Sequence, residues 1–458
     1  MDKTAEKFVD YASELAYSDL TPAAIHAVKR SVVDAMGCAL GAFHAEPMKA
    51  IRSLAAMVSA GKPATVIGTK IRSSPELAGF ANSAMIRYAD FSDDFFGAKG
   101  DSGPHPSDNI GGVLAAAESA GADGKSLVLG VALAYEACGQ MMDQIILQKG
   151  GWDYAIVHAI ASALGTAKMF GLTHEQMRNA LGLAVVPNVA LLQTRLGELT
   201  NWKGLAGPNG SRAGFFAVQL AQAGITGPAE PFEGGAGFMK QLNNRFDLGI
   251  FGGRDTPFKV EGTFFKHYPV VYSGQLLIWS AFELRQKINH EDIESLCLHL
   301  VGRYAIAKAT HPNYWNPMTH ETADHSLPYL TAAALVDGEI TARTLTPERF
   351  RDPVILALVQ KIHFQEDKQY TAAFPGTFNC RMEATLKSGQ VVTLHRTNPK
   401  GHPANPMSDQ EIEAKFLKQV DAVLPSAQSR ALLDQLWNLE KVHDIGNLLT
   451  LTKVAGSE

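Results

Sequence analysis

Residues 110–142 read IGGVLAAAESAGADGKSLVLGVALAYEACGQMM, two runs rich in alanine, leucine and glycine on either side of a short break. Small residues let helices pack closely, and a helix that is apolar on most sides is buried. Similar runs occupy residues 157–170, 174–185 and 212–224. Thr21 and Pro22 offer a cap and a first helical residue for another helix that runs to Leu40. The sequence therefore predicts a body of packed helices up to about residue 262.

The pattern changes after Gly262. Residues 295–303 alternate leucines with other residues as strands do, and residues 380–386 and 391–395 predict a hairpin. Helical signals return with the capping-box spacing of residues 408–411. We therefore expect a mainly α protein with an inserted α/β domain. The helical domain would comprise residues 1–263 and 398–458, and the α/β lid residues 264–397, with helices at 323–336 and 353–361.

The bulk composition excludes several classes of protein. The chain has 458 residues, 46% apolar and 19% charged, as expected for a soluble globular protein of two or three domains. Its formal charge of −5 argues against nucleic acid as a partner, because phosphate binding favours a basic surface. Neither an apolar signal core nor a membrane-length apolar run is visible, so we expect a cytoplasmic protein that does not span a membrane.

The cysteines do not form a metal-binding pattern. The chain has 4 cysteines, all far apart, and none belongs to a C-x-x-C pair. Zinc and iron–sulfur sites usually need such spacing. We therefore expect no metal and no cofactor, and any reaction must depend on side chains. The cysteines are Cys38, Cys138, Cys297 and Cys380.

The first polar segment with possible chemistry is Asp90-Phe91-Ser92-Asp93-Asp94, followed by His105-Pro106-Ser107-Asp108-Asn109. Three carboxylates within five residues repel one another and commonly lie at an exposed helix end. A calcium loop is an alternative, but the EF-hand spacing is absent. The third interpretation is a loop held by rigid helices that carries acid–base groups.

Lys203 and Lys266 each lie among apolar or small neighbours, Trp202-Lys203-Gly204 and Phe265-Lys266-His267. A single lysine is usually a solvated surface group, whereas a buried amine needs an anionic partner. Two ammonium groups could bind two carboxylates of a substrate and stabilise developing charge. Their replacement would then lower kcat/KM by about 10²-fold and largely spare folding. Arg195 could do the same or pair with Glu198, and the sequence leaves both open.

Taken in order, these segments resemble the MmgE/PrpD family, which includes 2-methylcitrate dehydratase and cis-aconitate decarboxylase. The resemblance runs from Asp34-Ala35-Met36-Gly37 to Gly401-His402-Pro403. Asp90 and Asp93 match the aspartates of the family's D-F/Y-x-D-T motif. His105 matches the histidine that follows this motif. Asp94 stands where the family usually has threonine and adds a negative charge beside an anionic substrate.

The resemblance implies a discontinuous helical domain with a smaller α/β lid, in a homodimer. It also implies a cofactor-independent lyase that dehydrates a 2-methylcitrate-like tricarboxylic acid by acid–base catalysis. The alternatives are a cis-aconitate-type decarboxylase, an amino-dicarboxylate epimerase, or a non-catalytic scaffold that binds metabolites or proteins. The residues implicated are Asp90 and His105 for proton transfer, Lys203 and Lys266 for charge stabilisation, and Asp93, Asp153 and Arg195 for substrate binding.

Two further segments bear on the choice of branch. Decarboxylase-like relatives have a histidine after the aromatic residue of Gly151-Trp152-Asp153, where this chain has Asp153, as in the dehydratase branch. In Ala323-Asp324-His325-Ser326, we expect Asp324 and Ser326 to cap a helix and His325 to be structural. A tyrosine that family members present just upstream corresponds to His311, or to Tyr314 if the loop shifts.

Overall fold

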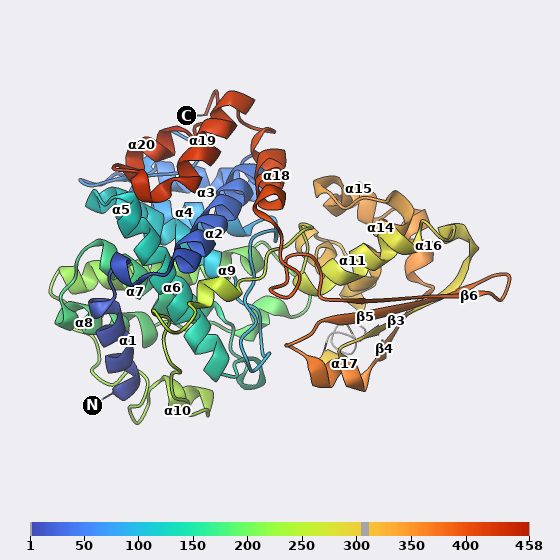
Figure 1. Ribbon diagram of the computed structural model, residues 1–458, viewed down its shortest axis with the longest axis horizontal. Helices are drawn as coiled ribbons and strands as arrows, with labels where there is room; N and C mark the ends of the chain where they lie inside the picture. The colour runs from blue at the N-terminus through green and yellow to red at the C-terminus, as the bar shows by residue number, and fades with distance from the viewer. Residues whose placement is uncertain (1, 304–310, 458) are drawn as a thin grey trace. The chain divides into compact units, whose positions relative to one another are not determined.

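The computed structural model describes residues 2–303 and 311–457, and it is mainly helical with one small mixed sheet (Figure 1). The chain divides into two compact units. The first contains Met1–Leu192, Gly204–Thr263 and Ser408–Glu458. The second contains Gln193–Lys203 and Phe264–Met407. The mainly α prediction is confirmed, and the division into a helical domain and a lid with the expected boundaries stays a prediction.

The first unit is built on helices that are buried on most sides. Helices α6 (Gly124–Gln144) and α7 (Ala155–Met169) run against each other at its centre (Figure 1). Their glycines permit this approach: a Cβ on Gly165 would lie 2.9 Å from the Gly130 carbonyl oxygen. Around them lie α1 (Lys3–Glu14), α2 (Pro22–Gly41), α3 (Glu46–Ala56), α4 (Pro75–Arg87), α5 (Ile110–Ala120), α8 (His174–Val185), α10 (Phe238–Leu242), α18 (Asp409–Val420), α19 (Ser426–Trp437), α20 (Ile445–Thr450) and a two-stranded ribbon of β1 (Ala64–Thr65) with β2 (Arg72–Ser73).

Local capping signals set several of these helices. Thr21 accepts a hydrogen bond from the Ala24 amide at the start of α2, and Ser408 forms the expected capping box with Glu411 at the start of α18. Helix α9 (Trp202–Gln222) begins earlier than the run 212–224 indicated, because it continues through Pro208 and several glycines that usually end helices.

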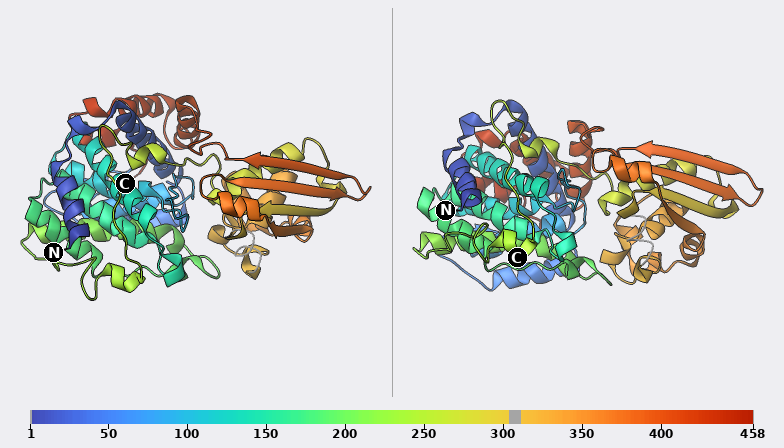
Figure 2. Two further views of the ribbon diagram at one scale, coloured as in Figure 1. Left: turned by 60° about the horizontal axis from the view of Figure 1, so that its bottom comes forward. Right: turned by 90° about the horizontal axis from the view of Figure 1, so that it is seen from below.

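The second unit carries a four-stranded sheet in the order β4–β3–β5–β6. Strands β3 (Ile293–Leu300) and β4 (Ile362–Glu366) are parallel. Strand β5 (Asn379–Leu386) is antiparallel to β3 and forms the predicted hairpin with β6 (Val391–Thr397). Figure 2 shows α11 (Tyr272–Leu284), α14 (Leu327–Asp337) and α16 (Pro353–Val359), in yellow to light orange, gathered beside this sheet.

The helix predicted over 323–336 is interrupted. A short helix, α13 (His320–Ala323), ends before Asp324, and α14 starts after Ser326. The Ser326 hydroxyl accepts a hydrogen bond from the Tyr329 amide at 3.2 Å, which confirms Ser326 as a cap. Gly338, at φ 73°, ends α14. No helix within residues 2–303 and 311–457 is long and apolar enough to cross a membrane.

Candidate active site

The acidic loop, residues 90–94, follows α4 in the first unit and is buried. The exposed fractions of Asp90, Asp93 and Asp94 are 1%, 1% and 3%, so the interpretation as an exposed helix end is wrong. Asp90 has φ 48°, in the left-handed region that residues other than glycine seldom occupy. Such a conformation persists only where the surroundings hold it, and it is frequent at functional sites.

Arg87 compensates the charge of Asp90. Its Nη1 lies 2.5 Å from Asp90 Oδ1, and the side chains are 2% and 1% exposed. Burial disfavours the guanidinium charge, but Asp90 and other neighbours outweigh that effect and hold the pKa of Arg87 well above its ordinary value. A charged guanidinium therefore fixes the Asp90 carboxylate. The sequence signal for Arg87 was a single cation at the end of an apolar helix, three residues before the acidic loop.

The imidazole of His105 is oriented by the backbone of the acidic loop. His105 Nδ1 lies 2.5 Å from the Asp93 carbonyl oxygen. A carbonyl only accepts hydrogen bonds, so Nδ1 carries the proton, and in the neutral ring Nε2 carries the lone pair. Nε2 lies 3.9 Å from Asp90 Oδ1, and the ring meets Tyr154 edge to face at 6.0 Å. This arrangement prepares Nε2 to accept a proton and places a carboxylate near the resulting charge.

Asp93 is held by groups on both oxygens. The Tyr135 hydroxyl donates to Oδ2 at 2.6 Å, and the Ser107 amide donates to Oδ1 at 3.1 Å. Burial raises the pKa of Asp93 to about 6, although these hydrogen bonds favour the ionised form. Asp93 thus links α6 to the loop and orients His105 through its carbonyl, and its predicted contact with substrate stays a prediction.

A second buried histidine lies nearby in the same unit. His158 on α7 is fully buried, and its Nδ1 lies 3.1 Å from Asn109 Nδ2. Its Nε2 lies 3.7 Å from Asp108 Oδ2. Its burial and these partners make His158 a core residue of the first unit.

In the second unit, the buried Lys203 and Asp324 form a cluster with the partly exposed His325. Lys203 Nζ lies 3.1 and 3.3 Å from the two oxygens of Asp324, and the side chains are 2% and 1% exposed. Asp324 Oδ1 also contacts Nδ1 of His325. The surface interpretation of Lys203 is therefore wrong. The same holds for Lys266, which is 1% exposed. The sequence indicated Asp324 only as a cap, and its pairing with Lys203 was missed because 121 residues separate them.

The remaining predicted residues have local partners. Arg195 Nη1 donates to the Lys203 carbonyl oxygen at 2.6 Å, which ties its loop to the first turn of α9. Asp153 Oδ1 accepts from the Ala155 amide at 3.0 Å and thereby caps α7. Tyr314 is buried, which raises the pKa of its hydroxyl to about 12. Substrate contacts of Arg195 and Asp153 stay predictions.

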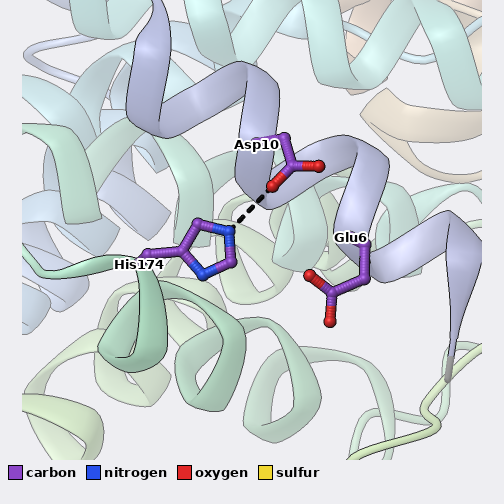
Figure 3. A group of neighbouring side chains, drawn as sticks. All are labelled: Glu6, Asp10 and His174. Carbon is purple, nitrogen blue, oxygen red and sulfur yellow. Dashed lines mark hydrogen bonds and ion pairs between the residues drawn. The ribbon is translucent and has the colours of Figure 1, made fainter.

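One surface group in the first unit has the residue types of a metal site. Figure 3 shows Glu6 and Asp10 on α1 facing His174 at the start of α8. His174 Nε2 already lies 2.8 Å from Asp10 Oδ1, and Arg178 Nη1 lies 3.6 Å from Glu6 Oε1. A neighbouring cation and a helix N-terminus both disfavour a metal ion. The group is explained as ion pairs that join α1 to α8.

Sequence profiles of two known domains match this chain. The MmgE/PrpD N-terminal domain matches residues 6–250, and the MmgE/PrpD C-terminal domain matches residues 268–439. The chain belongs to the MmgE/PrpD family. The resemblance noted from the separate motifs is thereby confirmed.

Characterised members of the MmgE/PrpD family align over most of the chain. The mitochondrial 2-methylcitrate dehydratase of Yarrowia lipolytica is 27% identical, over 88% of this chain and 80% of its own length. The 2-methylcitrate dehydratase of Salmonella typhimurium is 28% identical, over 94% and 93%. The cis-aconitate decarboxylase of Mus musculus is 24% identical, over 99% and 94%. The family-level function is therefore that of a dehydratase or decarboxylase.

Proposed function

We propose that this protein is a cofactor-independent hydro-lyase that dehydrates a 2-methylcitrate-like tricarboxylic acid to the cis-aconitate-type product. The observation that carries the proposal is the buried, oriented imidazole of His105 beside an ion-paired carboxylate. Relatives named 2-methylcitrate dehydratase align over most of the chain. Family members work as small-molecule enzymes, and we propose the same for this chain, as a homodimer.

His105 is the general base in this proposal. The proton to be removed lies alpha to a carboxylate and is weakly acidic, so the base needs a defined lone pair and support for the charge it acquires. The Asp93 carbonyl fixes the proton on Nδ1, and Asp90 faces Nε2 at 3.9 Å. Because Arg87 favours the ionised form of Asp90, that carboxylate stabilises the imidazolium and does not act as the acid.

Lys203 and Lys266 bind the substrate carboxylates in the proposed reaction. As the carbon–hydrogen bond breaks, negative charge accumulates on the adjacent carboxylate, and an ammonium group stabilises that charge. The carbon–oxygen bond then breaks, and the hydroxide takes a proton and leaves as water. We assign that proton to Nε2 of His325 in its imidazolium form, which the contact of Nδ1 with the Asp324 carboxylate stabilises, and the ring is left neutral after the transfer.

Decarboxylation of a cis-aconitate-type acid is the second candidate. A cis-aconitate decarboxylase from Mus musculus aligns over 99% of this chain. Loss of carbon dioxide also leaves negative charge beside a carboxylate, so the same lysines would serve. The side chain of Asp153, where decarboxylase-like relatives have histidine, favours dehydration.

The purified protein should be incubated separately with 2-methylcitrate, citrate and cis-aconitate. Formation of the conjugated double bond is followed by absorbance, and carbon dioxide release is measured in parallel. Dehydration predicts an absorbance rise with 2-methylcitrate and no carbon dioxide. His105→Gln should lower kcat by about 10²–10⁴-fold, as expected for loss of a general base. Carbon dioxide release from cis-aconitate without dehydration of 2-methylcitrate would replace the first candidate with the second.

A further inference from the structure

We propose that Lys415, on α18, is a positioning residue that holds the backbone of the acidic loop in its working conformation. The proposal concerns the loop that carries Asp90 and orients His105, and it rests on the proposed function for its catalytic consequence. Its structural consequence can be measured without turnover.

Lys415 makes three contacts in the first unit. Its Nζ donates to the Phe91 carbonyl oxygen at 2.7 Å and lies 2.6 Å from Asp34 Oδ1. The same ammonium lies 4.0 Å from the centroid of the Phe91 ring, within the range of a cation–π contact. The side chains of Lys415 and Asp34 are only 5% and 2% exposed. One ammonium group thus holds both the backbone and the ring of Phe91 against α2.

Phe91 is the link between the two groups that the reaction needs. It follows Asp90, whose φ of 48° is unfavourable for a residue with a side chain. It precedes by two residues Asp93, whose carbonyl orients His105. Arg87 fixes the side chain of Asp90. The Phe91 carbonyl comes next in the chain, and among the hydrogen bonds of the described residues it accepts only the one from Lys415. Without it, the strained backbone of Asp90 has a route to relax.

The ion pair is poorly explained by stability alone. Replacing a buried ion pair with well-packed apolar residues is often neutral or stabilising. Here α18 packs against α2, as Figure 1 shows, and apolar residues of α18 such as Ile412 and Phe416 already bury that face. The ammonium group of Lys415 pairs with Asp34 and also reaches the carbonyl and the ring of Phe91, and this reach toward the acidic loop is accounted for by the residues that the loop positions.

The test compares Lys415→Met, Lys415→Arg and the matched control Lys418→Met, whose lysine is exposed on the same helix. Hydrogen–deuterium exchange is measured by mass spectrometry on peptides that cover residues 88–105, α2 and α18. For Lys415→Met we expect exchange in residues 88–105 to be at least about tenfold faster, and to rise more than the exchange of α2 and α18, which increases because Asp34 is left uncompensated. Lys418→Met should match the parent everywhere. Lys415→Arg keeps a cationic donor and should restore much of the loop's protection.

Kinetics supply the second measurement. The loop orients the proposed base His105, and the carboxylate-binding lysines lie elsewhere in the chain, so Lys415→Met should lower kcat by about tenfold or more and change KM by less than about threefold. Unchanged exchange in residues 88–105 would overturn the proposal. Equal acceleration of exchange in residues 88–105, α2 and α18 would also overturn it, because that result indicates only a loss of overall stability. If the parent protein turns over none of the three acids, the proposed function fails, and the exchange result still decides the role of Lys415.

Discussion

Lys203→Met should separate the structural contribution of Lys203 from its catalytic one. The substitution keeps a long, flexible side chain but removes the ammonium group that compensates Asp324, a carboxylate that is 1% exposed. Removing one partner of a buried ion pair typically costs 3–5 kcal/mol, because the other charge remains buried. His325 still contacts Asp324, so we expect a loss near the lower limit, about 3 kcal/mol. The sequence had suggested that folding would be largely spared, and the Asp324 partner changes that expectation.

The double variant Lys203→Met/Asp324→Asn removes both charges and should recover most of that stability. Urea unfolding followed by circular dichroism gives the free energy of unfolding for each protein. Both variants should nevertheless lose about 10²-fold or more in kcat/KM, because the Lys203 ammonium group no longer stabilises the developing charge. Lys287→Met, at an exposed lysine of the same unit, is the control and should stay within about 0.5 kcal/mol of the parent.

Two results would refute this reasoning. If Lys203→Met unfolded within about 0.5 kcal/mol of the parent, the ion pair would contribute nothing measurable. If the double variant recovered kcat/KM together with stability, Lys203 would act only by supporting Asp324. Retained activity in both variants would remove Lys203 from the reaction.

Three further outcomes are expected. Burial lowers the pKa of His402 to about 4, and its Nδ1 accepts from the Ala404 amide at 3.0 Å. Its contribution to the free energy of unfolding is therefore fully present above the unfolded pKa of 6.5 and falls by about 3 kcal/mol as the pH drops toward 4. Urea titrations of His402→Gln should no longer show that loss. The raised pKa of Asp93 acts in the opposite direction, because between pH 4 and 6 the folded protein keeps a proton there that the unfolded chain has lost. As the pH rises through that range, the free energy of unfolding should decline by about 3 kcal/mol, and Asp93→Asn should remove that decline in the same titrations. Exhaustive treatment with EDTA should leave turnover intact, and restoration of lost activity by a divalent ion would contradict a side-chain mechanism.

Most helices could be predicted because their signals are local. The caps Thr21 and Ser408 act within a few residues, and each was correctly placed. The prediction of one helix over 323–336 was wrong for a non-local reason. Asp324 interacts with Lys203, and the Ser326 hydroxyl also contacts the Tyr314 carbonyl, so this segment is fixed by contacts that the sequence pattern does not contain.

The burial of the acidic loop could not be predicted from its composition. Adjacent carboxylates normally favour solvent, and here Asp90 has a cation three residues away in Arg87, whereas the other groups that hold the loop are distant in sequence. Tyr135 on α6 donates to Asp93, and Lys415 on α18 donates to the backbone of Phe91, 324 residues away. The motif indicated candidate residues for chemistry, and that assignment stays a prediction, but it contained no information about the groups that hold them.

The supporting groups also explain why the acidic loop could be buried without losing its charges. A buried carboxylate with no partner would take up a proton and lose its use as a charged group. Asp90 has Arg87, whereas Asp93 accepts from the neutral donors Tyr135 and Ser107, and burial raises its pKa to about 6. Two aspartates three residues apart are therefore held differently, one by a cation and one by neutral donors. In the mechanism that we propose, Asp90 supports the charge that His105 Nε2 acquires, and Asp93 contributes its carbonyl.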